Sequence, residues 1–214
     1  MRHNTLVIRT PPGRLAAGAL AILMSGPAAL AQDAPAAGSG ESVGRLLGGA
    51  LVGLGAHELG HLVFDVVFDA DPGIEKVTFK GLPFFAITHR GDVTPRQEYV
   101  ISSAGFWAQH ATSEWILSAD PDLRHTTGSF RKGVLAFNVG ASAVYATAAF
   151  ARVGPAERDT RAMATSLGID ERWVGAMILV PAVLDAVRYF KPDARWAAWS
   201  SRGWKIGLVL LVLK

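Results

Sequence analysis

Apolar residues gather into four long blocks along the chain, and short polar segments separate these blocks. The blocks cover residues 43–68, 99–117, 134–153 and 173–190. Each is about as long as a membrane-crossing helix, which needs roughly 20 residues. Each also carries polar residues, which lipid tolerates only where they point into a bundle. The pattern therefore predicts a mainly α-helical fold, a polytopic membrane bundle of about four transmembrane helices.

Between the first two blocks the pattern changes to one that is typical of strands. Residues 76–80 (KVTFK) alternate polar and apolar side chains, as a half-exposed strand does, and residues 84–88 (FFAIT) form a second β-prone run. The Gly-Leu-Pro sequence at residues 81–83 is typical of a turn. We expect a short β-hairpin directly after the first helix.

The amino-terminal residues have the pattern of a secretory leader. Basic residues precede an Ala-rich apolar stretch, and the small residues Ala29 and Ala31 fit a signal-peptidase site. Residues 1–31 are therefore interpreted as a signal peptide, the alternative being an uncleaved membrane anchor. Either interpretation predicts export, and together with the four apolar blocks it predicts a multi-pass location in the cell membrane.

The rest of the chain divides into three parts by composition. Residues 32–42 are small, polar and rich in Pro and Gly, which predicts a flexible linker. Residues 43–190 hold the four apolar blocks and form the predicted helical core. Residues 191–214 contain three tryptophans before an apolar end, which predicts a C-terminal helix that lies at the membrane interface or inserts.

Composition supports a membrane protein and narrows the chemistry. Half of the residues are hydrophobic and 18% are charged, where soluble domains average about 25% charged residues. The net charge of +3 comes from scattered basic residues, so a nucleic-acid partner is not expected. The chain has no cysteine, which excludes disulfides, thiolate metal ligands and a cysteine nucleophile.

The strongest chemical signal is the sequence HELGH, residues 57–61, inside the first apolar block. On a helix the two histidines, His57 and His61, lie on one face and can bind the same Zn²⁺ ion. Glu58 between them can accept a proton from the water that the metal makes acidic. Five residues can match this pattern by chance, but ionisable groups buried in an apolar block need a partner, and a metal supplies one.

At this point the chain resembles the site-2 protease family of membrane-embedded zinc metalloproteases, whose HExxH motif lies in a transmembrane helix. In that family a β segment, an AGPxxN-like motif and an LDG-type motif follow. Residues 101–105 (ISSAG) resemble the opening of the second motif, and residues 181–188 (PAVLDAVR) resemble the third. Phe106 stands where the family has Pro, and Ala186 where it has Gly. The resemblance implies that residues 43–190 form a membrane metallopeptidase-like core.

The resemblance also implies roles for two residues outside HELGH. Asp185 takes the position of the third zinc ligand, although Arg188, at helical i+3 spacing, is an alternative partner for its carboxylate. Gln109 stands where the family has Asn, and is expected to help catalysis by holding a substrate carbonyl. Glu114 on the second block is the rival third ligand, as in soluble zincins. Asp65, at i+4 from His61, is a candidate acceptor that orients the imidazole, the alternative being that it faces the aqueous end of the helix.

These expectations give one main functional hypothesis and two alternatives. The main hypothesis is a zinc endopeptidase that cuts a transmembrane or membrane-proximal peptide in or near the membrane, with membrane lipid around it. The first alternative is a non-catalytic zinc-binding membrane protein derived from the same family. The second is an exported soluble zincin-type metallopeptidase that uses Glu114 as its third ligand.

Overall fold

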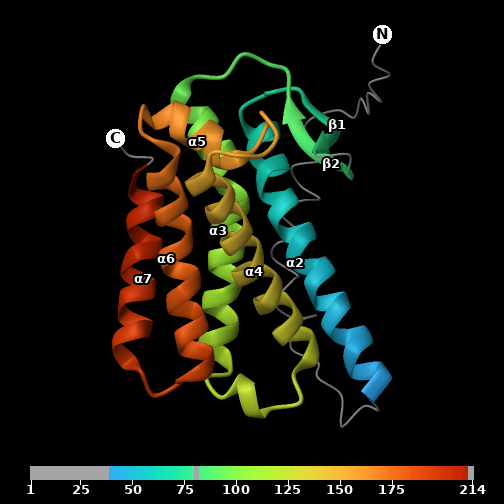
Figure 1. Cartoon of the computed structure of the whole chain (residues 1–214), viewed down its shortest axis with the longest axis vertical. Coiled ribbons are helices and arrows are strands. Elements are labelled where there is room, and N and C mark those ends of the chain that lie inside the picture. Colours follow the sequence, from blue (N-terminus) through green and yellow to red (C-terminus); the bar gives the residue numbers. More distant parts are fainter. Residues whose placement is uncertain (1–38, 80–81, 212–214) are drawn as a thin grey trace.

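The structure is a computed structural model that describes residues 39–79 and 82–211. In chain order the elements are α2 (Ser39–Val67), β1 (Pro72–Phe79), β2 (Leu82–His89), α3 (Pro95–Ala119), the 3₁₀ helix η1 (Leu123–His125), α4 (Ser129–Ala151), α5 (Asp159–Leu167), α6 (Glu171–Phe190) and α7 (Arg195–Leu210). The long helices run side by side, with the hairpin and the short α5 at one end of the bundle and η1 at the other (Figure 1). The prediction of a mainly α-helical fold with a short hairpin is confirmed.

Three helices of the described residues are long and apolar enough to cross a membrane, namely α2 over residues 40–67, α4 and α6. The second apolar block, which became α3, is not among them. Its length is sufficient, but its polar residues lower its hydropathy, and α3 buries them by contacting α2, α4, α5, α6 and α7. The count of about four transmembrane helices is therefore supported for three of the four blocks.

Helix α2 extends further toward the amino terminus than the first apolar block. It begins at Ser39, so residues 39–42, which composition placed in a flexible linker, are helical. Glu41 in the first turn pairs with Arg45 one turn later at 2.5 Å, an i,i+4 arrangement that favours the helix. The predicted signal peptide and the remainder of the predicted linker lie outside the described residues.

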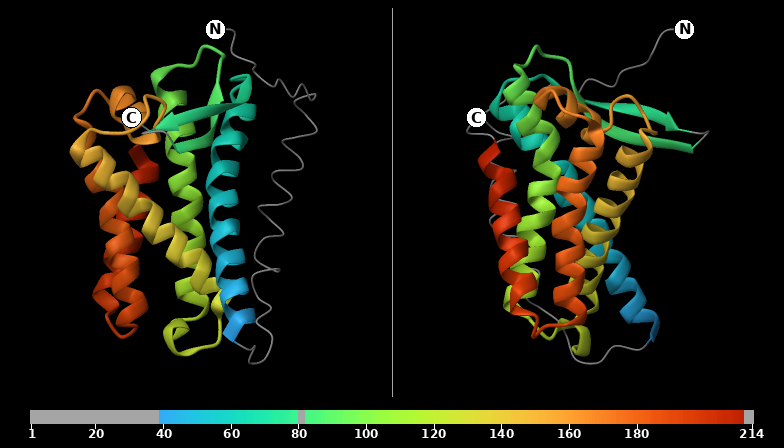
Figure 2. Two further views of the ribbon diagram at one scale, coloured as in Figure 1. Left: turned by 45° about the vertical axis from the view of Figure 1, so that its right-hand side comes forward. Right: turned by 60° about the vertical axis from the view of Figure 1, so that its left-hand side comes forward.

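Helices α2 and α4 cross with their backbones in close contact, because a glycine on each helix faces the other. A side chain at Gly49 would meet the carbonyl oxygen of Phe130, and one at Gly133 would meet the carbonyl oxygen of Leu46. Small residues are typical of close helix contacts in membranes. The crossing is visible when the bundle is turned (Figure 2).

The hairpin connects α2 to α3 at the end of the bundle that also holds α5. Its strands are antiparallel, from Pro72 opposite His89 to Phe79 opposite Leu82. The predicted turn at residues 81–83 is therefore too long, because residues 82 and 83 pair with β1. After the hairpin, Thr94 caps α3 through a capping box with Gln97, so the sequence itself sets where α3 begins.

Candidate metal centre

Three side chains from two distant parts of the chain converge at one point. His57 and His61 lie on α2 and are buried, and Asp159 is the first residue of α5. Nε2 of His57 is 3.2 Å from Nε2 of His61. Oδ2 of Asp159 is 3.4 Å from the former nitrogen and 3.6 Å from the latter. Within the described residues this is the one group of three His or acidic side chains whose donor atoms lie close enough to hold a metal ion.

The spacing of these donors suits a small divalent cation. Three donors about 2.0–2.1 Å from one tetrahedral ion lie roughly 3.3–3.4 Å from one another, which matches the separations of 3.2, 3.4 and 3.6 Å. Oδ2 of Asp159 is buried and has no hydrogen-bond partner among the described residues. The polar atoms that face it are the two imidazole nitrogens, and a cation shared by all three donors would offset the cost of burying the carboxylate.

The tautomer of His61 is set by a backbone contact. Its Nδ1 donates to the carbonyl oxygen of Ile101 on α3 at 2.8 Å. A carbonyl can only accept, so Nδ1 carries a proton, and in the neutral ring the lone pair is on Nε2, the nitrogen that faces His57 and Asp159. Metal-binding histidines are commonly oriented by such a contact. The prediction that Asp65 orients His61 is therefore corrected, since the carbonyl of Ile101 does so and Asp65 instead faces His89 at 3.4 Å.

The small residues of the segment 101–105 explain how α3 comes so close to α2. A side-chain carbon at Gly60 would lie 2.6 Å from the carbonyl oxygen of Ala104. One at Gly105 would lie 2.5 Å from Cε1 of His57 and 2.6 Å from Nε2 of His61. The glycine of HELGH and the glycine of ISSAG thus allow the two helices to touch. This contact brings the backbone of α3 against both imidazoles.

Asp159 is held in place by a charged contact between α5 and α6. Arg158, directly before it, binds Glu171 through two hydrogen bonds of 2.7 and 2.6 Å. Thr160, directly after it, donates to the same carboxylate at 2.6 Å. Glu171 at the start of α6 therefore fixes the residues on both sides of Asp159. This arrangement aims the Asp159 carboxylate at α2.

The carboxylate of Asp159 is ionised in this setting. Burial by itself raises its pKa, but the positive charge of the His61 and His57 rings, in their protonated forms, more than offsets that effect, so the pKa of Asp159 lies below its usual range. An ionised carboxylate is the form that binds a cation.

Two further side chains lie against the cluster. Glu58 is partly buried and close enough to interact electrostatically with both imidazoles and with Asp159. Tyr145 of α4 interacts with the Asp159 carboxylate, and its ring centroid is 5.8 Å from that of His57. Phe106 packs edge-on against His57, at 5.3 Å between centroids. The cluster thus combines three candidate ligands, a carboxylate base and a phenol in a largely apolar surround.

Asp185 does not lie with the two histidines in this structure, contrary to the expectation from the family motif. Its carboxylate accepts a hydrogen bond from Ser201 at 2.7 Å and pairs with Lys205 at 2.8 Å, both on α7. Arg188 is also near, at 3.3 Å. Asp185 is 14 residues beyond Glu171 on α6, about 21 Å along the axis at 1.5 Å per residue. The carboxylate that joins His57 and His61 is Asp159.

Glu114, the rival third ligand, belongs to the same charged network as Asp185. It binds Arg188 at 2.5 Å and Arg202 at 2.7 Å. It lies nine residues beyond Gly105 on α3, about 13 Å along the axis. Glu114 therefore lies far from the imidazoles that Gly105 contacts, and it serves to join α3 to α6 and α7.

Gln109, the candidate catalytic amide, is buried one helical turn beyond Gly105. Its Oε1 accepts from Ser142 at 3.4 Å, and its backbone carbonyl accepts from Asn138 at 3.0 Å. Its Nε2 has no hydrogen-bond partner among the described residues. Gln109 thus retains a free donor, but its contacts are with α4, and its catalytic role stays a prediction.

Sequence reasoning missed Asp159 and Tyr145. Asp159 stands in the charged segment ERDT between two apolar blocks, where an acidic residue is typical of a solvated helix start. Tyr145 is one aromatic residue in an apolar block and carries no distinguishing spacing. Glu171 gave no signal either, because an acidic residue in the first turn of a helix is favourable without a basic partner.

Comparisons of the chain with protein-family models, with curated proteins and with solved structures find no match in any of the three. The family resemblance therefore rests on the sequence motifs alone. The candidate metal centre rests on the geometry of His57, His61 and Asp159.

Proposed function

We propose that the chain is a zinc-dependent endopeptidase that hydrolyses a peptide bond in or near a membrane. The observation that carries the proposal is the convergence of His57, His61 and Asp159 at separations of 3.2, 3.4 and 3.6 Å. A set of two imidazoles and one carboxylate is typical of catalytic zinc sites, which keep a fourth position open. Zinc bound there supplies a Lewis acid for a carbonyl and makes water acidic enough to lose a proton near neutral pH.

Each nearby side chain has a step that it can perform in such a reaction. Glu58 is adjacent in sequence to His57 and has no ligand role, so it accepts the proton of the attacking water and passes it to the leaving amine. Tyr145 supplies a hydroxyl donor beside Asp159, where it stabilises negative charge on the substrate carbonyl oxygen. Gln109, with its free amide donor, is the candidate for holding the substrate backbone.

The surroundings favour a substrate that is itself membrane-associated. The histidines belong to α2, one of the three helices that are apolar and long enough to cross a membrane. The hairpin and α5 gather at the end of the bundle nearer Asp159 (Figure 2). A peptide segment that emerges from the membrane would meet the cluster from that end.

The test compares wild-type protein with Glu58→Gln, both purified in detergent, loaded with zinc and incubated with unfolded protein and apolar peptide substrates. We expect the variant to keep stoichiometric zinc and to lose roughly 10²–10⁴-fold in turnover, the usual contribution of a general base. Wild-type protein that binds zinc and cleaves nothing would favour the non-catalytic alternative. Equal cleavage by both proteins would remove Glu58 from the mechanism.

A further inference from the structure

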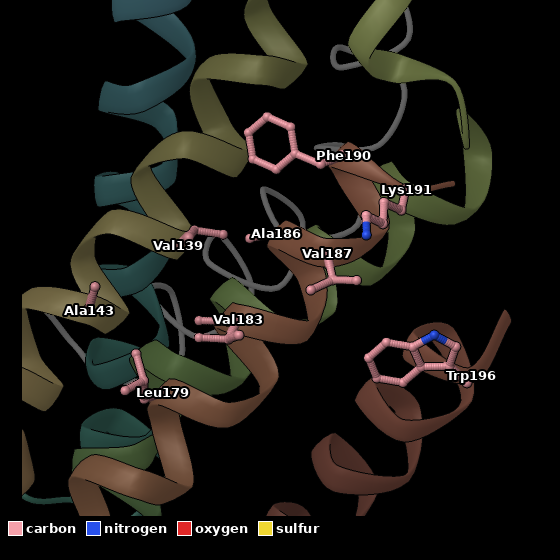
Figure 3. A pocket seen from close by; sticks show the side chains of 10 residues that line it. Val139, Ala143, Leu179, Val183, Ala186, Val187, Phe190, Lys191 and Trp196 are labelled. Atoms are coloured by element: carbon pink, nitrogen blue, oxygen red, sulfur yellow. The ribbon is translucent and has the colours of Figure 1, made fainter. Parts of the chain in front are cut away.

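A groove of about 410 Å³ lies between α4 and α6, away from the metal centre. Its lining is apolar except for one lysine, and it includes Val139, Ala143, Val183, Ala186, Lys191 and Trp196. Figure 3 shows Val139 and Ala143 on one wall, the α6 side chains opposite them, and Trp196 on the neighbouring helix. None of the candidate metal ligands lines this groove.

The groove follows two helices that are apolar enough to cross a membrane. Both walls belong to candidate membrane spans, and Val183 in the lining is 50% exposed. Exposed apolar side chains on such helices face acyl chains rather than water. The apolar part of the groove would therefore face the acyl chains of the bilayer.

One end of the groove has the chemistry of the membrane surface. Helix α6 ends at Phe190, and Lys191 begins the turn to α7, at the end of the bundle opposite the hairpin (Figure 1). Trp196, 61% exposed, lies in the first turn of α7. Tryptophan and lysine are the residues that mark the lipid–water interface. Lys191 and Trp196 therefore lie at headgroup depth.

Lys191 is available to bind an anion. Its side chain is exposed, and within the described residues no hydrogen bond or ion pair holds its ammonium group. It is the one charged side chain in the lining, so the groove pairs an apolar floor with a single positive charge at its mouth. This charge pattern is complementary to an acyl chain that ends in an anionic headgroup.

We propose that the groove between α4 and α6 binds an anionic phospholipid, with one acyl chain between the helices and the phosphate against Lys191. An acyl chain suits the groove better than a helix, which is about 10–12 Å wide with its side chains. Ala143 and Ala186, the small side chains of the lining, leave space between the helices, and a volume of about 410 Å³ accommodates one acyl chain. Trp196 would pack beside the lipid glycerol region.

The experiment measures lipid binding by the full-length protein in non-ionic detergent with native mass spectrometry. The probes are dioleoylphosphatidylglycerol and dioleoylphosphatidylcholine, which share acyl chains and differ in net charge. Lys191→Glu tests the headgroup contact, with Lys76→Glu, an exposed lysine on the hairpin, as its control. Ala143→Phe fills the groove, with Val144→Phe as its control, because Val144 is exposed on the same helix, about 100° around it from Ala143, and outside the lining.

We expect wild-type protein and both controls to prefer phosphatidylglycerol. Lys191→Glu should weaken that binding roughly five- to thirtyfold, as expected for removing or reversing one interfacial charge, and Ala143→Phe should abolish it. Equal binding of both lipids by wild-type protein, or unchanged binding by either test variant, would overturn the proposal. A dimer or a bound apolar peptide in place of lipid, removed by Ala143→Phe, would identify a helix-docking surface and overturn it as well.

Discussion

Oδ2 of Asp159 lies 3.4 Å from Nε2 of His57, so a residue from a polar connection completes a cluster that begins inside the first apolar helix. Zinc binding can therefore distinguish the two candidates for the third ligand, Asp159 and Asp185. Asp159→Ala should weaken zinc binding more than about a hundredfold, because even the groups that only orient ligands contribute 10–100-fold. Asp185→Ala should leave zinc affinity unchanged in the folded fraction.

Zinc titration with a competing chelator, on detergent-purified protein, measures both affinities. Loss of zinc in Asp185→Ala with retention in Asp159→Ala would restore the family alignment at α6 and reject the cluster. Near-ultraviolet circular dichroism of each variant shows whether the protein compared is folded.

Asp185 joins two helices, so we expect its substitution to change the stability of the protein and not its zinc affinity. It is buried and pairs with Lys205 at 2.8 Å, joining α6 to α7. Asp185→Leu should lower the free energy of unfolding by about 3–5 kcal/mol, since it leaves a buried lysine without its main partner. The double variant Asp185→Leu, Lys205→Met should recover most of that loss.

Denaturant titration in mixed micelles, followed by tryptophan fluorescence, checks this pair. If the double variant is no more stable than the single one, the ion pair is not what holds Asp185 in place. Zinc affinity of the double variant should match that of wild-type protein.

The apolar pattern predicted most of the fold because helix length and helix ends depend on residues that are close together in the sequence. Each long block became a helix with ends within a few residues of those expected, and Thr94 with Pro95 marks the start of α3 through local capping. The short α5 was missed because its nine residues are fewer than the roughly 11–18 over which helical periodicity is read, and because few of its side chains are strongly apolar.

The metal centre was only half predictable for a similar reason. His57 and His61 share one helix, so their spacing alone places them together. The third carboxylate comes from elsewhere in the chain, and its place depends on how α5 docks on α3 and α6. Asp185 stood in a segment that matched a motif, but Lys205, 20 residues later, provides its partner. Sequence spacing could not show that partner.

Glu171 should influence zinc binding without touching the metal. It holds Arg158 and Thr160 on either side of Asp159. Glu171→Gln removes the charge that anchors Arg158, so we expect zinc affinity to fall 10–100-fold while the helices remain folded. The control is Asp170→Ala at the neighbouring position, which removes a helix cap and an exposed pair with Arg152.

The control should lower stability by about 1 kcal/mol, the usual value for a lost cap, and leave zinc affinity unchanged. Isothermal titration with zinc distinguishes the two variants. Equal zinc affinities of Glu171→Gln and wild-type protein would mean that Asp159 reaches the histidines without the contact between Glu171 and Arg158.

Gly105 gives the sharpest steric test of the site. An added methyl group would lie 2.5 Å from Cε1 of His57 and 2.6 Å from Nε2 of His61, the nitrogen whose lone pair faces the other donors. Gly105→Ala must therefore displace an imidazole or separate α2 from α3, and overpacking of this kind typically costs about 1–3 kcal/mol. We expect the variant to fold with reduced stability and to lose zinc.

Gly55→Ala, on α2 with open space around it, should keep zinc and gain or retain stability. Zinc content measured by atomic absorption on both folded variants decides the matter, because normal zinc in Gly105→Ala would show that α3 does not pack against the imidazoles.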